Sequence, residues 1–341
     1  LRWIASTQTS SGLMATRPEQ ISSVPYFANY AALALLDERA YRPAVRRYME
    51  WYLSHLNLPD QWGQYGTVYD HALRDDALRS FEQRTFTYDS ADSYAGTFLS
   101  LAASYLRKTG DVDFIRENLP ALRRVAALLA SLQEPDGLVR SGGGVKTKYL
   151  MNDAEDLRGL RDWAELLEGL WYRDESRAYL SRANRLAAAI ERWMWDPSTG
   201  TYRWAIDGEG RRYNSDWSRW YPDAVAQLYP AMFGLIPPAG DRARALIQTF
   251  GLKHPGWASF QKSDPYPWMI VGYAAAVAGD AAFSGDAAET TAAEEMLANS
   301  RYLFRTSDRW YDLESAFYLM TEWKLHAVSS SEAWRIATLR Y

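Results

Sequence analysis

The sequence predicts an all-α protein in which six helical hairpins form a ring. Six stretches rich in apolar, small and aromatic residues recur along the chain, and nearly every one opens with a carboxylate. More polar, amphipathic stretches lie between them. Helices that are apolar on all sides are buried, whereas amphipathic helices cover a core with one face. The alternation therefore predicts that one helix of each hairpin lines the centre and the other lies outside it.

Each of these helices is expected at a definite place in the chain. The predicted inner helices are residues 24–37, 89–106, 153–171, 221–235, 264–279 and 312–328. The predicted outer helices are residues 41–56, 111–132, 174–195, 241–250 and 287–304. In the first outer helix, Val45, Tyr48 and Tyr52 recur at helical spacing, with arginines on the other faces. In a ring of hairpins, the starts of all inner helices would meet at one end.

A short repeated motif supports the hairpin array. Residues 5–13 (ASTQTSSGL) match residues 130–138 (ASLQEPDGL), and residues 195–202 (WDPSTGTY) form a looser third copy. In each copy a helix ends in a turn of Pro, Asp, Ser or Gly, and a short extended piece follows. Because no Pro- or Ser-rich linker divides the chain, we expect a single (α/α)6 toroid domain over residues 1–341.

Two long connections are candidates for functional rims or lids. Residues 57–87 contain Trp62, two tyrosines and the pair Asp75-Asp76, and residues 139–151 contain three consecutive glycines. Long loops in compact domains are often functional. The glycines allow conformations that other residues rarely adopt, so the second loop is the more adaptable one.

Composition excludes several classes of function. The net charge of −4 argues against non-specific nucleic-acid binding, and the absence of cysteine excludes disulfides and thiolate metal sites. Four scattered histidines show no metal-ligand spacing, so neither a metal nor another cofactor is expected. The longest apolar run is too short for a membrane span. Because the chain starts at Leu1, we expect a secreted or periplasmic protein, with a cytoplasmic one as the alternative. The oligomeric state stays open.

Acidic residues recur at the predicted inner-helix starts. Asp89 and Asp92 share the spacing D-x-x-D with Asp153 and Asp156. Helix capping explains an acid at such a position, because a carboxylate accepts backbone N–H bonds there. The aromatic company is not explained by capping, since Trp and Tyr flank the inner starts more than the outer ones. Aromatic rings with paired carboxylates are typical of sugar-cleaving sites.

The chemistry that suits these residues is glycoside hydrolysis, in which one carboxyl group protonates the leaving oxygen and another attacks the sugar or activates water. Sugar rings pack an apolar face on Trp and Tyr. The catalytic candidates are Asp92, Asp153, Asp223 and Asp264. The substrate-binding candidates are Asn29, Asp89, Tyr94, Trp217, Trp220, Gln261, Trp268, Trp310 and Glu314. Trp62 is expected to line the same groove. Asp223 is the candidate for activating water, because Pro222 fixes it in a first helical turn.

The pattern resembles the six-hairpin (α/α)6 glycosidase superfamily over nearly the whole chain. Residues 89–95 (DSADSYA) are loosely similar to the Asp-rich segment that opens a central helix in family 8 glycoside hydrolases. The resemblance implies that Asp92 contacts the sugar at the cleavage point. That family's proton-donating Glu opens an early inner helix, where this chain reads SSVPYFAN at residues 22–29 and Glu19 is the nearest Glu. The proton donor is therefore expected from another inner helix, with Asp153 and Asp264 as candidates.

Other functions fit the same ring of hairpins. Arg140, Lys146 and Lys148 could neutralise the carboxylate of an acidic sugar in a polysaccharide lyase or a uronic-acid-sugar hydrolase. A carbohydrate-binding toroid without catalysis is a second alternative. The motif Gln133-x-x-Asp136-Gly137 resembles a turn of terpenoid cyclases, but Asp75-Asp76 lacks the third acid of their metal-diphosphate site.

Overall fold

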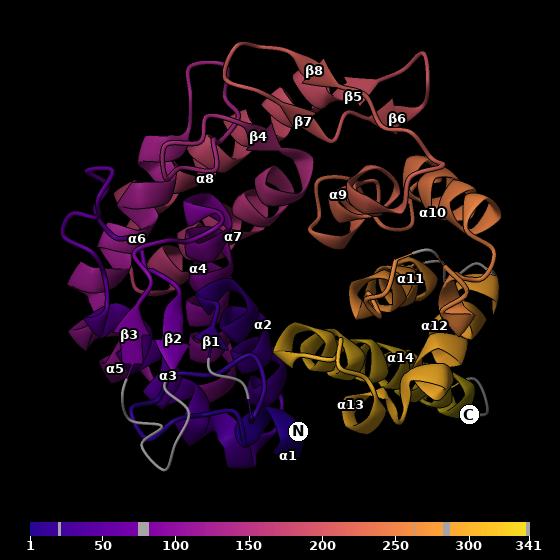
Figure 1. Cartoon of the computed structure of the whole chain (residues 1–341), viewed down its shortest axis with the longest axis horizontal. Coiled ribbons are helices and arrows are strands. Elements are labelled where there is room, and N and C mark those ends of the chain that lie inside the picture. Colours follow the sequence, from indigo (N-terminus) through magenta and orange to yellow (C-terminus); the bar gives the residue numbers. More distant parts are fainter. Residues whose placement is uncertain (20–21, 74–81, 263, 282–286, 339–341) are drawn as a thin grey trace. The chain divides into compact units, whose positions relative to one another are not determined.

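The computed structural model describes residues 1–19, 22–73, 82–262, 264–281 and 287–338 (Figure 1). The chain divides into two compact units, residues 1–215 and residues 216–341. Helices make up most of both units, and every strand within the described ranges has only two or three residues. None of the helices in the described ranges is long and apolar enough to cross a membrane. The expectation of a single domain stays a prediction.

The buried helices of the first unit are α2 (Pro25–Leu36), α4 (Ala91–Thr109) and α7 (Leu150–Gly169). They confirm the first three predicted inner helices. Helix α2 packs on α4, and α4 packs on α7. The closest approach is between α4 and α7, where a Cβ atom placed on Gly159 would lie 2.4 Å from the carbonyl oxygen of Gly96. Two facing glycines thus let the helix backbones touch, as the small residues in these segments predict.

Amphipathic helices cover this buried layer. They are α1 (Arg2–Ala5), α3 (Arg42–Ser54), α5 (Val112–Glu117), α6 (Leu119–Leu132) and α8 (Arg173–Ala189), with the short helical turns η1 (Arg39–Tyr41) and η2 (Ile190–Met194). The predicted outer helix 111–132 is divided into α5 and α6 at Asn118, because Pro120 starts a new helix. Val45, Tyr48 and Tyr52 are buried on one face of α3, as predicted.

The repeated motif forms the same turn twice. The side-chain amide of Gln8 donates to the carbonyls of Gly12 and Ala44, over 2.9 and 2.8 Å. The amide of Gln133 donates in the same way to Gly137 and Arg182, over 3.0 and 3.1 Å. Each Gln therefore closes its own turn and ties it to a neighbouring outer helix. The predicted repeat is confirmed, and its glutamine has a structural role.

The loops between the helices of the first unit contain short antiparallel strands. Strand β2 (His71–Leu73) pairs with β1 (Ser22–Ser23), Ser22 opposite Ala72, and with β3 (Glu82–Arg84), His71 opposite Arg84. The other pairs involve β4 (Lys148–Tyr149), β5 (Trp195–Asp196), β6 (Thr201–Tyr202), β7 (Ala205–Ile206) and β8 (Arg212–Tyr213). Both predicted rim loops thus contain strands. Asp75 and Asp76 lie outside the described residues.

The second unit begins with the π-helical turn η3 (Trp220–Ala224). Its helices are α9 (Tyr229–Met232), α10 (Asp241–Lys253), α11 (Met269–Ala281), α12 (Ala287–Ser300), α13 (Leu303–Thr306) and α14 (Asp312–Thr338), with the turn η4 (Trp257–Ser259). Helices α11, α12 and α14 pack on one another.

Two predicted inner helices of the second unit were wrong in extent. Residues 221–235 do not form one helix, because Pro222 keeps Tyr221 extended (φ −129°, ψ 138°) and only η3 and α9 are helical in this range. Asp264 lies five residues before α11 rather than at its start. Pro265 and Pro267 come between them, and each lacks the backbone N–H that a helix interior needs.

Candidate functional site

Four buried carboxyl groups gather where α4 and α7 begin. We call Asp92, Asp153, Glu155 and Asp156 the acid cluster; each is at most 2% exposed. Asp92 is the second residue of α4, and the other three lie in the first two turns of α7. Buried carboxylates are normally paired with cations. Within the described part of the chain, no Lys or Arg forms an ion pair with any of these four. The four carboxyl groups are therefore buried without an ion-pair partner among the described residues.

Asp92 is held by a neutral donor. The side-chain amide of Asn152 lies 3.2 and 3.3 Å from its two carboxyl oxygens and also donates to the Ser90 hydroxyl, over 3.0 Å. The backbone N–H of Ser93 donates to Asp92 Oδ1 over 2.8 Å. Burial raises the pKa of Asp92 to about 7, although these hydrogen bonds oppose the shift. Asp92 can therefore hold or release a proton near neutral pH.

Glu155 is held by two phenols of α2. The hydroxyls of Tyr26 and Tyr30 donate to Glu155 Oε1 over 2.7 and 2.5 Å. Burial raises the pKa of Glu155 to about 7, the phenols lower it, and nearby Asp92 raises it. Like Asp92, this carboxyl group changes protonation in the neutral range.

Asp156 and Asp153 are the least satisfied members of the cluster. Neither carboxyl oxygen of Asp156 has a hydrogen-bond partner among the described residues, and the same holds for Asp153 Oδ2. Burial raises the pKa of both residues well above the ordinary value, and the nearby carboxyl group of Asp92 adds to the shift. Asp156 is packed against Gly96, where an added Cβ would lie 2.6 Å from its Oδ1. Burial therefore favours the protonated, neutral form of both groups.

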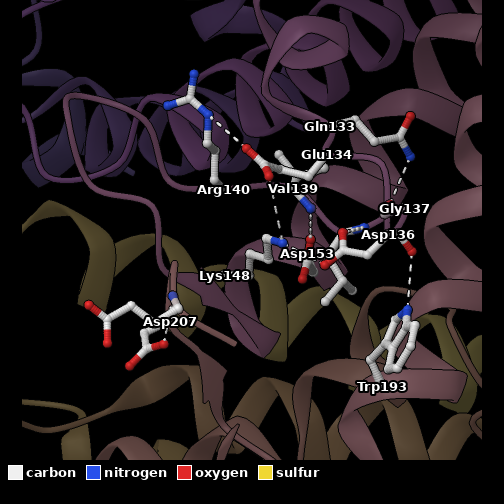
Figure 2. Close-up of polar contacts among 12 residues, drawn as sticks. Gln133, Glu134, Asp136, Gly137, Val139, Arg140, Lys148, Asp153, Trp193 and Asp207 are labelled. Atoms are coloured by element: carbon white, nitrogen blue, oxygen red, sulfur yellow. Dashed lines mark hydrogen bonds and ion pairs between the residues drawn. The ribbon is translucent and has the colours of Figure 1, made fainter. Parts of the chain in front are cut away.

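Asp153 accepts a backbone N–H, but not from its own helix. Figure 2 shows its Oδ1 receiving the Val139 N–H over 2.8 Å. The segment that presents Val139 follows the Gln133–Gly137 turn, in which the Lys148 ammonium pairs with Asp136 over 2.5 Å. The Trp193 indole donates to the Asp136 carbonyl over 3.2 Å. Asp153 thus fastens a loop to α7, so simple capping of its own helix is not its role.

A more accessible layer lies next to the acid cluster. The Tyr94 hydroxyl donates to Asp70 Oδ1 over 2.9 Å, and the backbone N–H of Asp89 donates to that hydroxyl over 3.4 Å. Asp70 is half-buried and Asp89 is exposed. Burial raises the pKa of Asp70 to about 7, and the charge of Asp89 adds to the shift of both Asp70 and Asp92. Asp70 thus contacts Tyr94, and the exposed Asp89 lies near both Asp70 and Asp92.

Asn29 and Tyr94, both predicted to bind substrate, lie in the core beneath this layer. The Asn29 amide donates to the Tyr94 carbonyl over 3.1 Å and to the Thr97 hydroxyl over 2.9 Å, and its oxygen accepts from Tyr48 over 2.8 Å. These contacts join α2, α3 and α4. Asn29 therefore positions Tyr94, and the Tyr94 hydroxyl in turn donates to Asp70.

Asp223 and the predicted rings of the second unit lie around η3 and the start of α11. Asp223 is buried, and its Oδ1 accepts the backbone N–H of Asp216 over 2.8 Å. The Trp220 ring lies 6.5 Å from Trp268 and 5.2 Å from the Lys262 ammonium. Tyr221 is exposed and packs on Trp268 with a ring separation of 4.8 Å. Trp217 is half-buried.

Asp264 and Glu314 both contact Trp268. The Trp268 indole donates to Asp264 Oδ1 over 2.7 Å. Glu314 accepts the backbone N–H groups of Trp268 and Met269 over 3.1 and 2.7 Å, so it caps the neighbouring helix α11. Burial raises the pKa of Glu314 to about 7.

The two other predicted residues of this unit lie apart from those contacts. Trp310 is buried and donates to the Ser315 hydroxyl over 2.6 Å. Gln261 is exposed, and its side chain packs against Gly256. The predicted sites thus fall into a group around Asp92 and Asp153 in the first unit and a group around Trp268 in the second.

Sequence reasoning did not single out Asp70, Glu155, Tyr26 or Tyr30. Glu155 and Asp156 lie in the predicted segment DAED, where four adjacent residues point to different sides of a helix. Their helical positions could have been compared with the tyrosines of residues 24–37, which recur four apart. Asp70 has no such signal, because it lies in a loop.

Comparison with known proteins identifies the fold. No protein-family model and no curated protein matches the chain. It aligns with a glycosidase variant at TM-score 0.65 and 12% identity, over 95% of this chain and 94% of that one. A family 63 mannosylglycerate hydrolase from Thermus thermophilus, in complex with glucose, aligns at TM-score 0.63 and 14% identity, over 94% and 98%. A sugar epimerase from a ruminal bacterium aligns at TM-score 0.56 and 10% identity, over 94% of each chain.

These alignments confirm the predicted all-α (α/α)6 toroid fold. The chain covers only 26% of a larger Bacillus rhamnosidase. Because identities are low and one neighbour is an epimerase, the function has to be argued from the site.

Proposed function

We propose that the protein is a carbohydrate-active enzyme, specifically a glycoside hydrolase that cleaves a poly- or oligosaccharide by carboxyl acid–base chemistry. The observation that carries the proposal is the acid cluster at the start of α4 and α7. A general acid must be protonated near the working pH, and enzymes achieve this by burying a carboxyl group. Asp92 and Glu155, with pKa values raised to about 7, meet that requirement.

Asp92 is assigned to the cleavage point. The charge of the exposed Asp89 acts on it, and the Asn152 amide orients both of its oxygens. In the reaction, the protonated Asp92 donates to the glycosidic oxygen as the bond from that oxygen to the anomeric carbon breaks. Water attacks the anomeric carbon and gives a proton to an ionised carboxylate, and the Asp223→Asn variant tests whether Asp223 is that base. Asp153 takes precedence over Asp264 as a second proton source, because it belongs to the acid cluster.

The role of Glu155 and Asp156 follows from their contacts. Glu155 is fixed by two phenols, and burial favours the neutral form of Asp156 beside it. A neutral Asp156 adds no negative charge to the site, whereas an ionised one would raise the pKa of Asp92 further. These two residues set the protonation of Asp92 without touching the sugar.

The alternative of an acidic-sugar enzyme is less well supported. Two of its three expected cations are engaged within the chain: Lys148 pairs with Asp136 over 2.5 Å, and Arg140 pairs with Glu134 over 3.4 Å. Only Lys146 of the three is exposed. The neighbourhood of Asp92 is rich in acid, which disfavours an anionic sugar.

The test is incubation with a panel of bacterial and plant polysaccharides, read by new reducing ends. Hydrolysis should appear for at least one glycan, and Asp92→Asn and Asp223→Asn should each reduce turnover by orders of magnitude while the fold is retained. Ultraviolet-absorbing ends would instead show a lyase, and an altered sugar without new reducing ends would show an epimerase. Near-full activity in both variants would contradict the assignment.

A further inference from the structure

A cluster of four aromatic rings lies on the rim loop beside the acid cluster. We call Trp62, Tyr69, Phe86 and Tyr88 the aromatic platform. The Tyr88 ring lies 4.9 Å from Trp62 and 5.9 Å from Tyr69, and Tyr69 lies 5.6 Å from Phe86. Tyr69 and Tyr88 are buried, whereas Trp62 is 39% exposed and Phe86 is 57% exposed. Two buried rings thus support two exposed ones.

The loop that carries Trp62 is held rigidly. Asp60 Oδ1 accepts the backbone N–H groups of Trp62 and Gln64 over 2.9 and 2.8 Å, and Asp60 Oδ2 accepts the Tyr88 hydroxyl over 2.7 Å. Loop aromatics with no function need no such support. A ring fixed before binding loses little conformational entropy when a ligand stacks on it.

The three consecutive glycines of the second rim loop also support the rings of the platform. Gly143 and Gly144 have φ angles of +59° and +83°. A Cβ on Gly143 would lie 2.8 Å from the Tyr88 ring, and a Cβ on Gly144 would lie 3.3 Å from the Trp62 ring. Only glycine combines these conformations with such close packing. The second rim loop therefore packs against the platform from one side.

The platform continues toward Asp70 and Asp89, the more accessible layer next to the acid cluster. Tyr88 lies 6.3 Å from the ring of Tyr94, whose hydroxyl binds Asp70, and Tyr88 directly precedes Asp89. Phe86 has a φ of +61°, which is uncommon for a residue other than glycine and is a form of strain often found at functional sites. Its carbonyl is held by the Gln61 amide over 2.6 Å.

We propose that the aromatic platform is a sugar-binding subsite that stacks pyranose rings of a neutral oligosaccharide on Trp62 and Phe86. The inference rests on the proposed function, because it extends the same site. Pyranose rings have an apolar face that matches an exposed indole or phenyl ring. Asp70 and Asp89 lie at the inner end of the platform, and their negative charge selects against acidic sugars. The substrate is therefore a neutral oligosaccharide.

The experiment measures calorimetric binding to the full chain carrying Asp92→Asn, so that ligands stay intact. The probes are neutral α-1,4- and β-1,4-linked glucose and β-1,4-linked mannose hexamers, the corresponding dimers, and a galacturonic acid hexamer. Trp62→Ala and Phe86→Ala should each raise the hexamer Kd about tenfold, as expected for truncating a buried contact ring. Trp62→Phe should recover part of the affinity. The dimer Kd should change less than the hexamer Kd, because a hexamer has more sugar rings to place on Trp62 and Phe86.

Tyr65→Ala is the matched control, since Tyr65 is 60% exposed on the same loop but belongs to no ring cluster. Its hexamer Kd should stay within about twofold of the parent. The proposal is overturned if Trp62→Ala and Phe86→Ala bind the hexamer normally, if Tyr65→Ala weakens binding equally, if the acidic hexamer binds tightest, or if no neutral hexamer binds.

Different results would contradict the sugar-binding platform and the hydrolase function. Hexamer binding that depends on Trp62 and Phe86, without hydrolysis by the unmutated chain, would leave the platform in place and remove the hydrolase function. Hydrolysis of a neutral hexamer with kcat/KM unchanged by both platform substitutions would leave the hydrolase function and remove the platform.

Discussion

Acidic residues near the buried-helix starts have aromatic neighbours in both units, but their hydrogen-bond partners differ. In the first unit, Glu155 accepts two phenol hydroxyls, Asp92 accepts the Asn152 amide as well as the Ser93 N–H, and Asp156 has no hydrogen-bond partner among the described residues. In the second unit, Glu314 accepts two backbone N–H groups. Carboxylates bound to backbone donors stabilise helix ends and loops. Buried acids without such donors cost stability, which a functional role would explain.

The largest expected effect separates Asp92 from Asp264. Asp92→Asn removes the proton that the proposed reaction needs, so turnover should fall by roughly 10²–10⁴-fold. Asp264→Asn keeps an oxygen for the Trp268 indole and the Tyr266 N–H, so turnover should change by less than about threefold. Reducing-end assays on one confirmed glycan, with urea midpoints to check folding, make the comparison. Equal losses in the two variants would contradict the difference between the units.

The second effect concerns how closely the buried helices pack. Gly159→Ala would place a Cβ against the backbone of Gly96, which a side chain cannot relieve, so we expect a loss of about 2–4 kcal/mol in the free energy of unfolding. Gly272→Ala in α11 meets the Met296 sulfur at 2.9 Å, and a flexible thioether can move. That loss should be nearer 1 kcal/mol. Urea denaturation measures both.

Gly169→Ala is the control for this pair. Gly169 ends α7, and an added Cβ would meet no atom within 4 Å. Since alanine favours a helix over glycine by up to about 1 kcal/mol, this variant should be as stable as the parent or slightly more so. Equal destabilisation by Gly159→Ala and Gly169→Ala would show that α4 and α7 are not in backbone contact.

The third effect is the pH dependence of stability in the first unit. Burial raises the pKa of Glu155 from near 4.5 to about 7, so the folded chain binds more protons than the unfolded chain between those values. This contribution to stability is fully present below about pH 4 and is lost as pH rises through 7. Glu155→Gln cannot ionise. Between pH 5 and 8 its free energy of unfolding, measured by urea denaturation, should therefore fall less than that of the parent. The difference should be of order 1–3 kcal/mol.

Glu168→Gln, at an exposed site on the same helix, is the matched control and should keep the parent's pH dependence. If Glu155→Gln also shows the parent's slope, the carboxyl group of Glu155 ionises normally in the fold.

Much of the fold could be predicted because helical periodicity and the repeated turn are local signals. The alternation of apolar and amphipathic stretches placed α2, α4, α7 and most outer helices within a few residues. The predicted bounds of two inner helices were wrong because proline lies in them, at Tyr221-Pro222 and between Asp264 and α11. Proline removes a local hydrogen bond that an apolar pattern does not record.

The site was less predictable, because it depends on partners far apart in sequence. The DAED segment pointed to Asp153, but the structure uses Asp153 to fasten Val139 and leaves Asp156 unpaired. The phenols that hold Glu155 come from a helix more than 100 residues earlier. Asp70 is brought to Tyr94 by a loop. A sequence pattern locates acids at helix starts, but it does not say which carboxyl group obtains a backbone donor.

The smallest expected effect tests the structural role of Glu314, which the sequence pattern had placed at the substrate. Glu314→Gln keeps one oxygen for the N–H of Met269 but turns an amide nitrogen toward the N–H of Trp268. Losing one capping bond should cost about 1 kcal/mol in the free energy of unfolding. Turnover should stay within about threefold of the parent, because the group acts on α11 and not on the sugar. Glu322→Gln, on the same helix α14, should change neither quantity. If Glu314→Gln instead lowered turnover as strongly as Asp92→Asn with unchanged stability, Glu314 would be a catalytic residue, and a carboxylate bound by backbone N–H groups could not be assumed to be structural.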